Sequence, residues 1–299
     1  MPPQSLNWQS KLILLLVVPW TAVSVVLQAR GFASDVPAVT IWSLGLSGLL
    51  GVLALALHAG TPAAAATGAL LTASMMFSAA SDPFQPWRSA IVPILAFMVL
   101  TSLATRLGRE RKQRLGTAES RHGRGAAQVA ANLGVAALAM SPSKTALLVY
   151  WALGALMANA PPTMILAPAL AALAEAAADT VSSEIGQVLG GRPFMLTTFR
   201  RVDPGTDGAV SLAGTLAGIL AAAAIAAAGA WALHGDARMF LVSLAGGVFG
   251  LLFDSLLGAT LERARWLNNN AVNFLSTASA AAFTLAMMAV IPHQAITDF

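Results

Sequence analysis

The sequence predicts an all-α, polytopic membrane protein: a bundle of about nine transmembrane helices forming one membrane-embedded domain over residues 1–299. Of the 299 residues, 57% are apolar and 10% are charged, and the mean hydropathy is +0.72. Soluble globular domains carry roughly 25% charged residues. So few charges cannot cover a water-facing surface, which excludes a soluble enzyme and a disordered chain. The lack of cysteine also excludes disulfides, thiolate metal sites and cysteine nucleophiles.

Nine apolar runs follow one another along the chain. A spanning helix needs about 20 apolar residues, and no Lys or Arg interrupts the interior of any run. The fifth run is short and the second and third are nearly continuous, so eight or ten spans also fit. The first run resembles a signal sequence, but no small-x-small cleavage site follows it, and we expect an uncleaved first helix. The runs are 12–29, 39–58, 62–80, 89–105, 126–141, 145–173, 211–233, 238–257 and 271–291.

Basic residues orient the bundle, because the cytoplasmic connections of membrane proteins are enriched in Lys and Arg. With a cytoplasmic N-terminus, the inner connections hold 13 of the 17 Lys and Arg residues. The chain is then expected to consist of N-terminal helices (1–105), a basic cytoplasmic loop (106–125) and a half with catalytic motifs (126–299). We expect this protein in a bacterial inner membrane, with its site facing the cytoplasm.

Two polar stretches in the second half, 175–218 and 254–277, are expected at the cytoplasmic side. Together they hold seven of the thirteen acids, and acids beside membrane spans usually face a bundle interior or a watery cavity. Glu175 and Asp179 are four residues apart and share one face of a continuing helix, and Asp254 is expected at the same depth. Carboxylates from different helices suit Mg²⁺ together with substrate phosphates. The simpler alternative is that these acids pair with nearby arginines.

A glycine-rich segment, Asp203–Gly208, has the composition of a turn. Its glycines allow backbone N–H groups to approach an anion closely, and Arg200 and Arg201 precede it. The helix expected to begin at Ser211 would add free amides and a favourable dipole. Gly214-x-x-x-Gly218 is equally typical of close helix packing, and both roles can coexist. A Walker A sequence is absent from the chain.

The basic loop 106–124 has two interpretations. It either anchors the protein on anionic lipid headgroups or binds a phosphorylated lipid or a nucleotide. Arg121, Arg124, Gln128 and Asn132 favour the second role, because the polar pattern continues from the loop into the following helix.

These segments resemble the integral membrane family that contains plant phytyl-phosphate kinase. The resemblance covers roughly residues 90–290, and Arg124, Gln128 and Asn132 match its upstream loop and helix. A fainter similarity links the chain to phytol and dolichol kinases and to CDP-diacylglycerol synthases. The matching segments are Asp179-Thr-Val-Ser-Ser-Glu184-Ile-Gly186, Pro204-Gly-Thr-Asp-Gly-Ala-Val-Ser211, Gly214-Thr215-Leu-Ala-Gly218, Asp254-Ser255-Leu-Leu-Gly258-Ala-Thr260-Leu and Asn269-Asn270-Ala-Val-Asn273.

The resemblance implies a kinase that adds a second phosphate to an isoprenoid monophosphate. CTP or another nucleoside triphosphate is the expected donor, with Mg²⁺ or Mn²⁺ as the metal. The expected partners are the lipid phosphate, the nucleotide and membrane lipids, with no nucleic acid, and a homo-oligomer is compatible with the sequence.

The expected site residues fall into three groups. Asp179, Glu184 and Asp254 are assigned to catalysis and to the metal, and Arg124, Gln128 and Asn132 to the acceptor headgroup. The residues assigned to the nucleotide and its phosphates are Arg200, Arg201, Pro204, Gly205, Thr206, Asp207, Gly208, Ser211, Gly214, Thr215, Asn269, Asn270 and Asn273.

Other functions stay open from the sequence. A CTP-dependent cytidylyltransferase or a lipid alcohol kinase would use similar motifs. A transporter also places acids and broken helices inside a bundle, but its repeated halves carry matching polar interruptions, whereas the polar motifs here lie in one half. A non-catalytic lipid-binding protein would need neither a phosphate-binding turn nor carboxylates at one depth.

Overall fold

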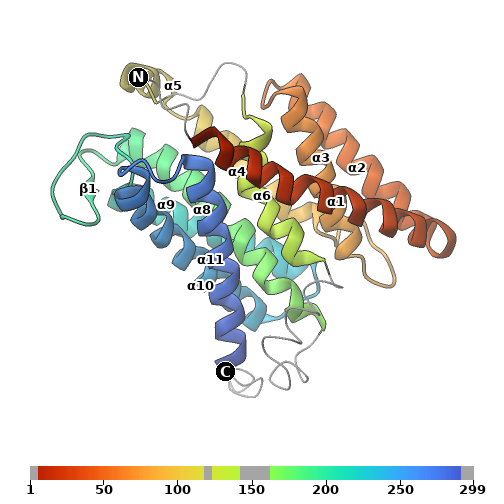
Figure 1. Cartoon of the computed structure of the whole chain (residues 1–299). Coiled ribbons are helices and arrows are strands. Elements are labelled where there is room, and N and C mark those ends of the chain that lie inside the picture. Colours follow the sequence, from red (N-terminus) through yellow and green to blue (C-terminus); the bar gives the residue numbers. More distant parts are fainter. Residues whose placement is uncertain (1–5, 118–122, 142–161, 291–299) are drawn as a thin grey trace.

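The computed structural model describes residues 6–117, 123–141 and 162–290, which form a bundle of helices (Figure 1). The predicted all-α, polytopic class is confirmed. Within the described ranges, the only sheet is a two-stranded antiparallel pair of β1 (Phe194–Met195) and β2 (Ala209–Val210).

The helices follow the apolar runs in order. The first half contains α1 (Asn7–Asp35), α2 (Pro37–Ala56), α3 (Pro62–Ser78), α4 (Ile91–Arg106), the short α5 (Arg109–Leu115) and α6 (Ala126–Met140). The second half contains the 3-10 helix η3 (Pro162–Leu166), α8 (Ala167–Leu189), α9 (Leu212–Ala232), α10 (Ala237–Leu257), the π-helix η4 (Gly258–Glu262) and α11 (Asn269–Val290).

Local sequence signals set several of the helix starts. Pro37 and Pro62 lie in the first turns of α2 and α3, where a missing N–H costs nothing. The side chains of Thr61, Ser211 and Asp236 cap α3, α9 and α10 by accepting hydrogen bonds from backbone N–H groups three residues later, at 3.2, 3.1 and 2.8 Å.

Helix α8 is the centre of the bundle. All of its residues from Ala167 to Ala178 are buried, and α4, α6, α9, α10 and α11 pack around it. Alanine dominates this segment, and its small side chain lets neighbouring helices approach closely. Helix α1 crosses α6 and α3 obliquely on the outside of the bundle (Figure 1).

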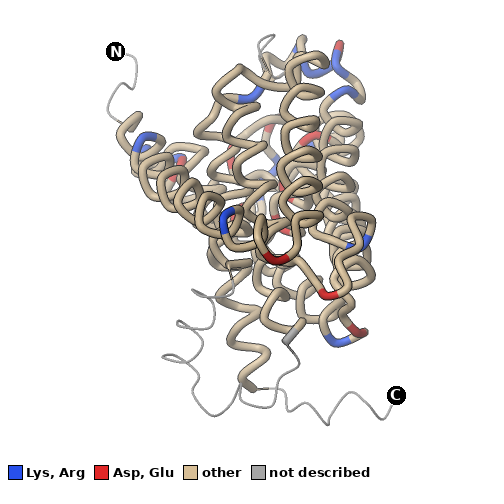
Figure 2. Tube along the Cα trace, turned by 90° about the vertical axis from the view of Figure 1, so that its right-hand side faces the viewer, with Lys and Arg blue, Asp and Glu red and all other residues tan. Residues whose placement is uncertain are grey.

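The outer helices present apolar side chains to their surroundings. Leu15 on α1, Ile41 on α2 and Leu220 on α9 are each about 70% exposed. A continuous apolar exterior is typical of a surface in contact with lipid. Most of the helical trace in Figure 2 carries no charge, and several acids lie between the helices.

Six helices of the described chain are long and apolar enough to cross a membrane, or seven if the bent pair α4 and α5 counts as one span. The expected count of about nine is therefore not confirmed. Helix α6 is shorter than the six, with 15 residues.

The sixth predicted span, 145–173, is wrong in its end. Residues 145–161 lie outside the described ranges, and α8 continues to Leu189. Hydropathy alone predicts that the span ends just before Glu175, the first acidic residue after the apolar run. A helix enclosed by other helices tolerates acids, because they face the bundle interior and not lipid. Residues 175–189 therefore belong to the central helix and not to a polar connection.

The predicted inner connections meet at one end of the bundle, which we call the polar end. The Gln9 side chain donates to the Trp266 carbonyl at 2.8 Å. The Arg124 N–H donates to the Ala59 carbonyl at 3.0 Å. The Thr117 hydroxyl lies 2.5 Å from the side-chain oxygen of Gln187. Helix α5 and strand β1 lie at this end, opposite the end of α11 (Figure 1).

Candidate functional site

Three carboxyl groups meet between α8 and α10. Glu175 and Asp179 share one face of α8, as their spacing predicts. Asp254, on α10, is a hydrogen-bonding neighbour of Asp179, and Glu175 interacts with both. Ser276 on α11 lies beside Glu175 and Asp254. We call Glu175, Asp179 and Asp254 the carboxylate cluster.

Two members of the cluster have buried oxygens without a hydrogen-bond donor among the described residues, whereas Oδ1 of Asp179 accepts from the Ser183 hydroxyl at 3.4 Å. Glu175 is 1% exposed, and neither of its carboxyl oxygens has a hydrogen-bond partner there. Oδ1 of Asp254 is also buried without one. The Ser276 hydroxyl does not fill this gap, because it donates to the Asn273 carbonyl at 3.0 Å. Buried ionised carboxylates are costly unless a positive charge or a donor compensates them, so the cluster is suited to a cation.

A hard cation such as Mg²⁺ prefers oxygen ligands, typically one or two carboxylates together with substrate phosphates and water. Asp179 and Asp254 fit that requirement, since both are partly exposed and lie side by side. Within the part of the chain that the structure describes, no group of three His, Cys, Asp or Glu side chains is arranged to hold a metal on its own. A metal here would thus need further ligands, such as substrate phosphates or water.

Glu184, the third residue expected at the metal, has a different partner. Its Oε2 lies 2.5 Å from Nζ of Lys112 on α5. Lys112 is 1% exposed and also donates to the carbonyls of Ala104 and Thr105, at 2.9 and 2.8 Å, at the end of α4. Glu184 therefore helps to fix α5 and the end of α4 against α8, while it still interacts with Asp179.

The sequence did not single out Glu262, which borders the cluster. Glu262 ends the π-helix η4 and interacts with Asp179, Asp207 and the Asn269 side chain. Single π-helical turns inside helices occur frequently at functional sites. Glu262 thus connects the carboxylate cluster with the glycine-rich turn.

The glycine-rich turn, Asp203–Gly208, lies directly against this π-helix. Gly208 adopts the left-handed conformation with φ of 70°, and a Cβ there would lie 2.0 Å from the Ala259 nitrogen. Only glycine permits this approach. Arg200 and Arg201 are exposed in the β1–β2 hairpin, and the Arg201 guanidinium lies 4.9 Å from the Phe194 ring centre. The turn therefore lies against the π-helix that carries Glu262, and the two arginines that precede it are exposed.

The start of α9 brings this helix close to α8. Gly214 and Gly218 lie against the carbonyls of Ser182 and Ala178, which an added Cβ would approach to 2.6 and 2.8 Å. The structure thus assigns both glycines to helix packing, the alternative that the pattern left open. Thr215 follows in the first turn of the helix, and its N–H donates to the Ser211 carbonyl at 2.8 Å.

The three predicted asparagines do not form one group. Asn269 reaches Glu262 at the border of the cluster. The Asn270 amide donates to the Ser10 hydroxyl at 2.9 Å and so ties α11 to α1. The Asn273 amide donates to Asn132 of α6 at 2.8 Å, in the buried core.

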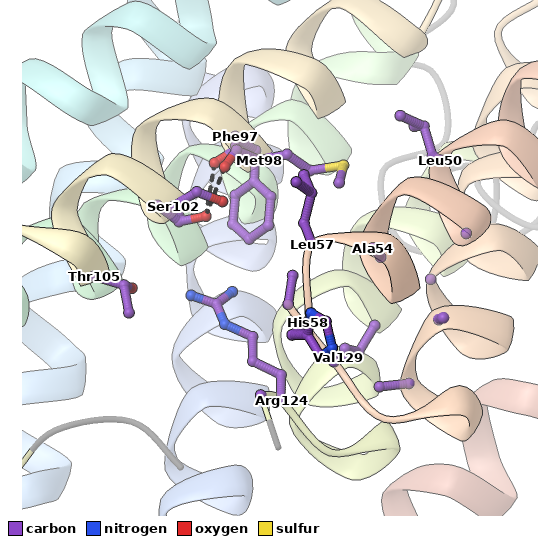
Figure 3. Close-up of a pocket in the computed structure, with 18 of the residues that line it drawn as sticks. Leu50, Ala54, Leu57, His58, Phe97, Met98, Ser102, Thr105, Arg124 and Val129 are labelled. Carbon is purple, nitrogen blue, oxygen red and sulfur yellow. Dashed lines mark hydrogen bonds between the residues drawn. The ribbon is translucent and has the colours of Figure 1, made fainter. Parts of the chain in front are cut away.

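A cavity of about 450 Å³ lies between α2, α3, α4 and α6 (Figure 3). Its wall is mostly apolar, but His58, Arg106, Arg109 and Arg124 line it at the polar end. Figure 3 shows the Arg124 side chain in this cavity. Arg124 also interacts electrostatically with Asp179. Its guanidinium therefore connects the cavity with the carboxylate cluster.

The predicted acceptor group is separated by the structure. Arg124 lines the cavity, but α6 turns Val129 and Leu133 toward it, and Gln128 and Asn132 are not part of its wall. Asn132 instead pairs with Asn273, and Gln128 is half-buried. The fourth residue of that pattern, Arg121, lies outside the described ranges.

Comparison with known proteins finds relatives in Methanocaldococcus jannaschii, Synechocystis and Arabidopsis thaliana. It is 45% identical to an uncharacterized membrane protein of Methanocaldococcus jannaschii over 36% of this chain and 45% of that protein. It is 34% identical to an uncharacterized membrane protein of Synechocystis over 68% of this chain and 75% of the relative. It is 40% identical to protein VTE6, chloroplastic, of Arabidopsis thaliana over 33% of this chain and 30% of the plant protein. No solved structure matches the chain at a significant level.

The sequence model of one family, described as integral membrane protein DUF92, matches residues 45–281. This range contains the carboxylate cluster, the glycine-rich turn and the cavity wall. The chain therefore belongs to the DUF92 family of integral membrane proteins.

Proposed function

We propose that this protein is a membrane-embedded kinase that transfers the γ-phosphate of a nucleoside triphosphate to an isoprenoid monophosphate. The observation that carries the proposal is the position of Arg124. Its side chain lines an apolar cavity and interacts with Asp179 of the carboxylate cluster. A lipid phosphate bound at Arg124 would therefore lie next to carboxylates suited to a metal-bound triphosphate.

The donor nucleotide is assigned to the other side of the cluster. Asp179 and Asp254 are the proposed metal ligands, and the turn Asp203–Gly208 approaches them through Asp207 and Glu262. Arg200 and Arg201 are exposed beside that turn and would offset phosphate charge. CTP is the proposed nucleotide because of the resemblance to the family of plant phytyl-phosphate kinase.

The reaction needs positioning and charge neutralisation more than acid–base chemistry. An oxygen of the acceptor phosphate attacks the γ-phosphorus, and the bond from that phosphorus to the β,γ-bridging oxygen breaks. The electron pair leaves with the nucleoside diphosphate, and a lipid diphosphate is formed. A phosphate monoester is largely ionised near neutral pH, so no side chain has to remove a proton. Mg²⁺, when bound, neutralises charge on the donor phosphates.

Arg124 has a defined role in this scheme. Its guanidinium would hold the acceptor phosphate and reduce the repulsion between two polyanionic reactants. Because basic residues gather at the polar end, we propose that this end faces the cytoplasm of a bacterial inner membrane.

A label-transfer assay tests the function. Detergent-purified full-length protein receives Mg²⁺, a prenyl monophosphate and CTP or ATP labelled at the γ-phosphate, with α-labelled CTP in parallel. We expect γ-label in a lipid diphosphate, lost in Asp179→Asn and Asp254→Asn. Asp35→Asn, at an exposed acid in the last turn of α1, is the matched control and should transfer normally. Wild-type rates in both cluster variants would refute the metal assignment, and transfer of the α-label would identify a cytidylyltransferase.

A further inference from the structure

The cavity between α2, α3, α4 and α6 is elongated along the helices. Helix α4 lines it from Ile94 to Thr105, and the helix rises about 16 Å between these two residues. Helix α2 lines it from Leu50 to Ala54, with Leu50 at the end away from the polar connections, and His58 lines it from the turn that follows this helix. The cavity therefore runs from the polar end into the apolar body of the bundle.

The two ends differ in chemistry. Leu50, Ile94 and Leu133 line the deep end, and Phe97 and Met98 line the middle. The Thr101 hydroxyl in the wall donates to the Phe97 carbonyl at 2.8 Å and so has no free proton for a ligand. At the polar end, the described residues offer no hydrogen-bond partner to the buried Thr105 hydroxyl. The cavity thus matches a molecule with a long apolar chain and an anionic head.

The volume and the charge limit the occupant further. A cavity of about 450 Å³ lies in the lower half of the roughly 300–1,000 Å³ typical of ligand sites, which favours one chain over the two chains of a phospholipid. The cationic or titratable side chains at one end complement a phosphate monoester. They are His58, Arg106, Arg109, Arg124 and Lys112, the last of which is paired with Glu184. The link from Arg124 to Asp179 directs that phosphate toward the carboxylate cluster.

We propose that this cavity binds the isoprenoid chain of the acceptor lipid, with the phosphate at Arg124. Leu50, Ile94 and Leu133 then form the floor that sets the longest chain accepted. This inference rests on the proposed kinase function for its ligand class, but it assigns a binding site and a specificity determinant that the proposed reaction does not by itself require.

Gly68 on α3 offers a direct way to fill the cavity. It lines the wall, and a Cβ there would meet only Cγ1 of Val129, at 3.8 Å, among its non-neighbouring atoms. Leucine is a better helix former than glycine. Gly68→Leu therefore fills part of the cavity with a side chain and does not strain the backbone. Gly48→Leu is the matched control, because Gly48 is exposed on α2 and a Cβ there has no neighbour within 4 Å.

The test measures direct binding of geranyl, farnesyl and geranylgeranyl monophosphate to full-length protein without nucleotide, and then phosphoryl transfer to the same lipids. We expect Gly68→Leu to weaken binding of the longest lipid by about tenfold or more, and Gly48→Leu to bind like wild type. Leu50→Ala, which deepens the floor, should shift the preference toward longer chains. Thermal unfolding of each variant in detergent checks folding.

The outcomes separate the cavity from the reaction. Equal binding by wild type and a folded Gly68→Leu, with no chain-length shift in Leu50→Ala, would overturn the cavity assignment even if transfer proceeds. Binding that depends on Gly68 without any phosphoryl transfer would leave the cavity assigned and refute the kinase. Displacement of the prenyl phosphate by phosphatidate at equal concentration would show that the site recognises a diacyl lipid phosphate instead, and would overturn the proposal.

Discussion

Nζ of Lys112 lies 2.5 Å from Oε2 of Glu184, and the lysine is almost completely buried. The pair joins α5, a short helix of the basic loop, to the central helix α8. Lys112 also lines the cavity, so this contact holds the polar end of the cavity wall in place. The basic loop, whose charge is compatible with a lipid anchor, thus also has a structural role, because it contributes the buried Lys112.

The Lys112–Glu184 pair should matter for stability. Lys112→Met leaves a partly buried carboxylate without its cation, a change that typically costs about 3 kcal/mol. The double variant Lys112→Met/Glu184→Leu should recover much of that loss, because replacing both partners is often nearly neutral. Thermal unfolding in detergent measures both.

Arg114→Met is the control for this pair. Arg114 lies 3.9 Å from Glu110 in an exposed ion pair, and such pairs contribute little. An equal loss of stability in Arg114→Met and Lys112→Met would show that burial of the pair has no special effect.

The contact of the glycine-rich turn with the π-helix should govern nucleotide binding. Gly208→Ala combines a left-handed backbone with a clash against Ala259, which should displace the turn and raise the KM for nucleotide several-fold. Gly116→Ala has the same backbone strain, with φ of 72°, but no neighbouring atom within 4 Å. Steady-state kinetics measure the KM for the nucleotide in both variants. Equal values in Gly208→Ala and Gly116→Ala would argue against a role of the turn in nucleotide binding.

The buried amide pair of Asn132 and Asn273 should act on stability and not on acceptor binding. Asn132→Ala leaves the Asn273 amide without its 2.8 Å partner, which typically costs about 1–3 kcal/mol. A double-mutant cycle with Asn273→Ala should give a coupling energy of about 1 kcal/mol. A higher KM for the lipid phosphate, with unchanged unfolding, would instead return Asn132 to the acceptor group that the sequence favoured.

Local features of the fold could be predicted from the sequence. Short-range rules predict the cap at Ser211 and the common face of Glu175 and Asp179. The placement of basic residues predicts that the inner connections meet at one end. The separation of Asn270 from Asn269 also follows from helical spacing, since adjacent residues of a helix do not face each other.

Features that depend on packing could not be predicted in this way. The end of α8 was missed because hydropathy does not reveal that a helix is enclosed by others. The pairing of Glu184 with Lys112 joins residues 72 positions apart, and the cavity arises from the spacing of four helices. None of these leaves a periodic signal in the chain.

In the proposed reaction, Arg124 holds the acceptor phosphate beside the carboxylate cluster. The steady-state kinetics of Arg124→Gln with a prenyl monophosphate and γ-labelled nucleotide test this role most directly. We expect the KM for the lipid phosphate to rise about tenfold or more, while the KM for the nucleotide stays near the wild-type value. Wild-type KM values for both substrates, or a rise confined to the nucleotide, would contradict it.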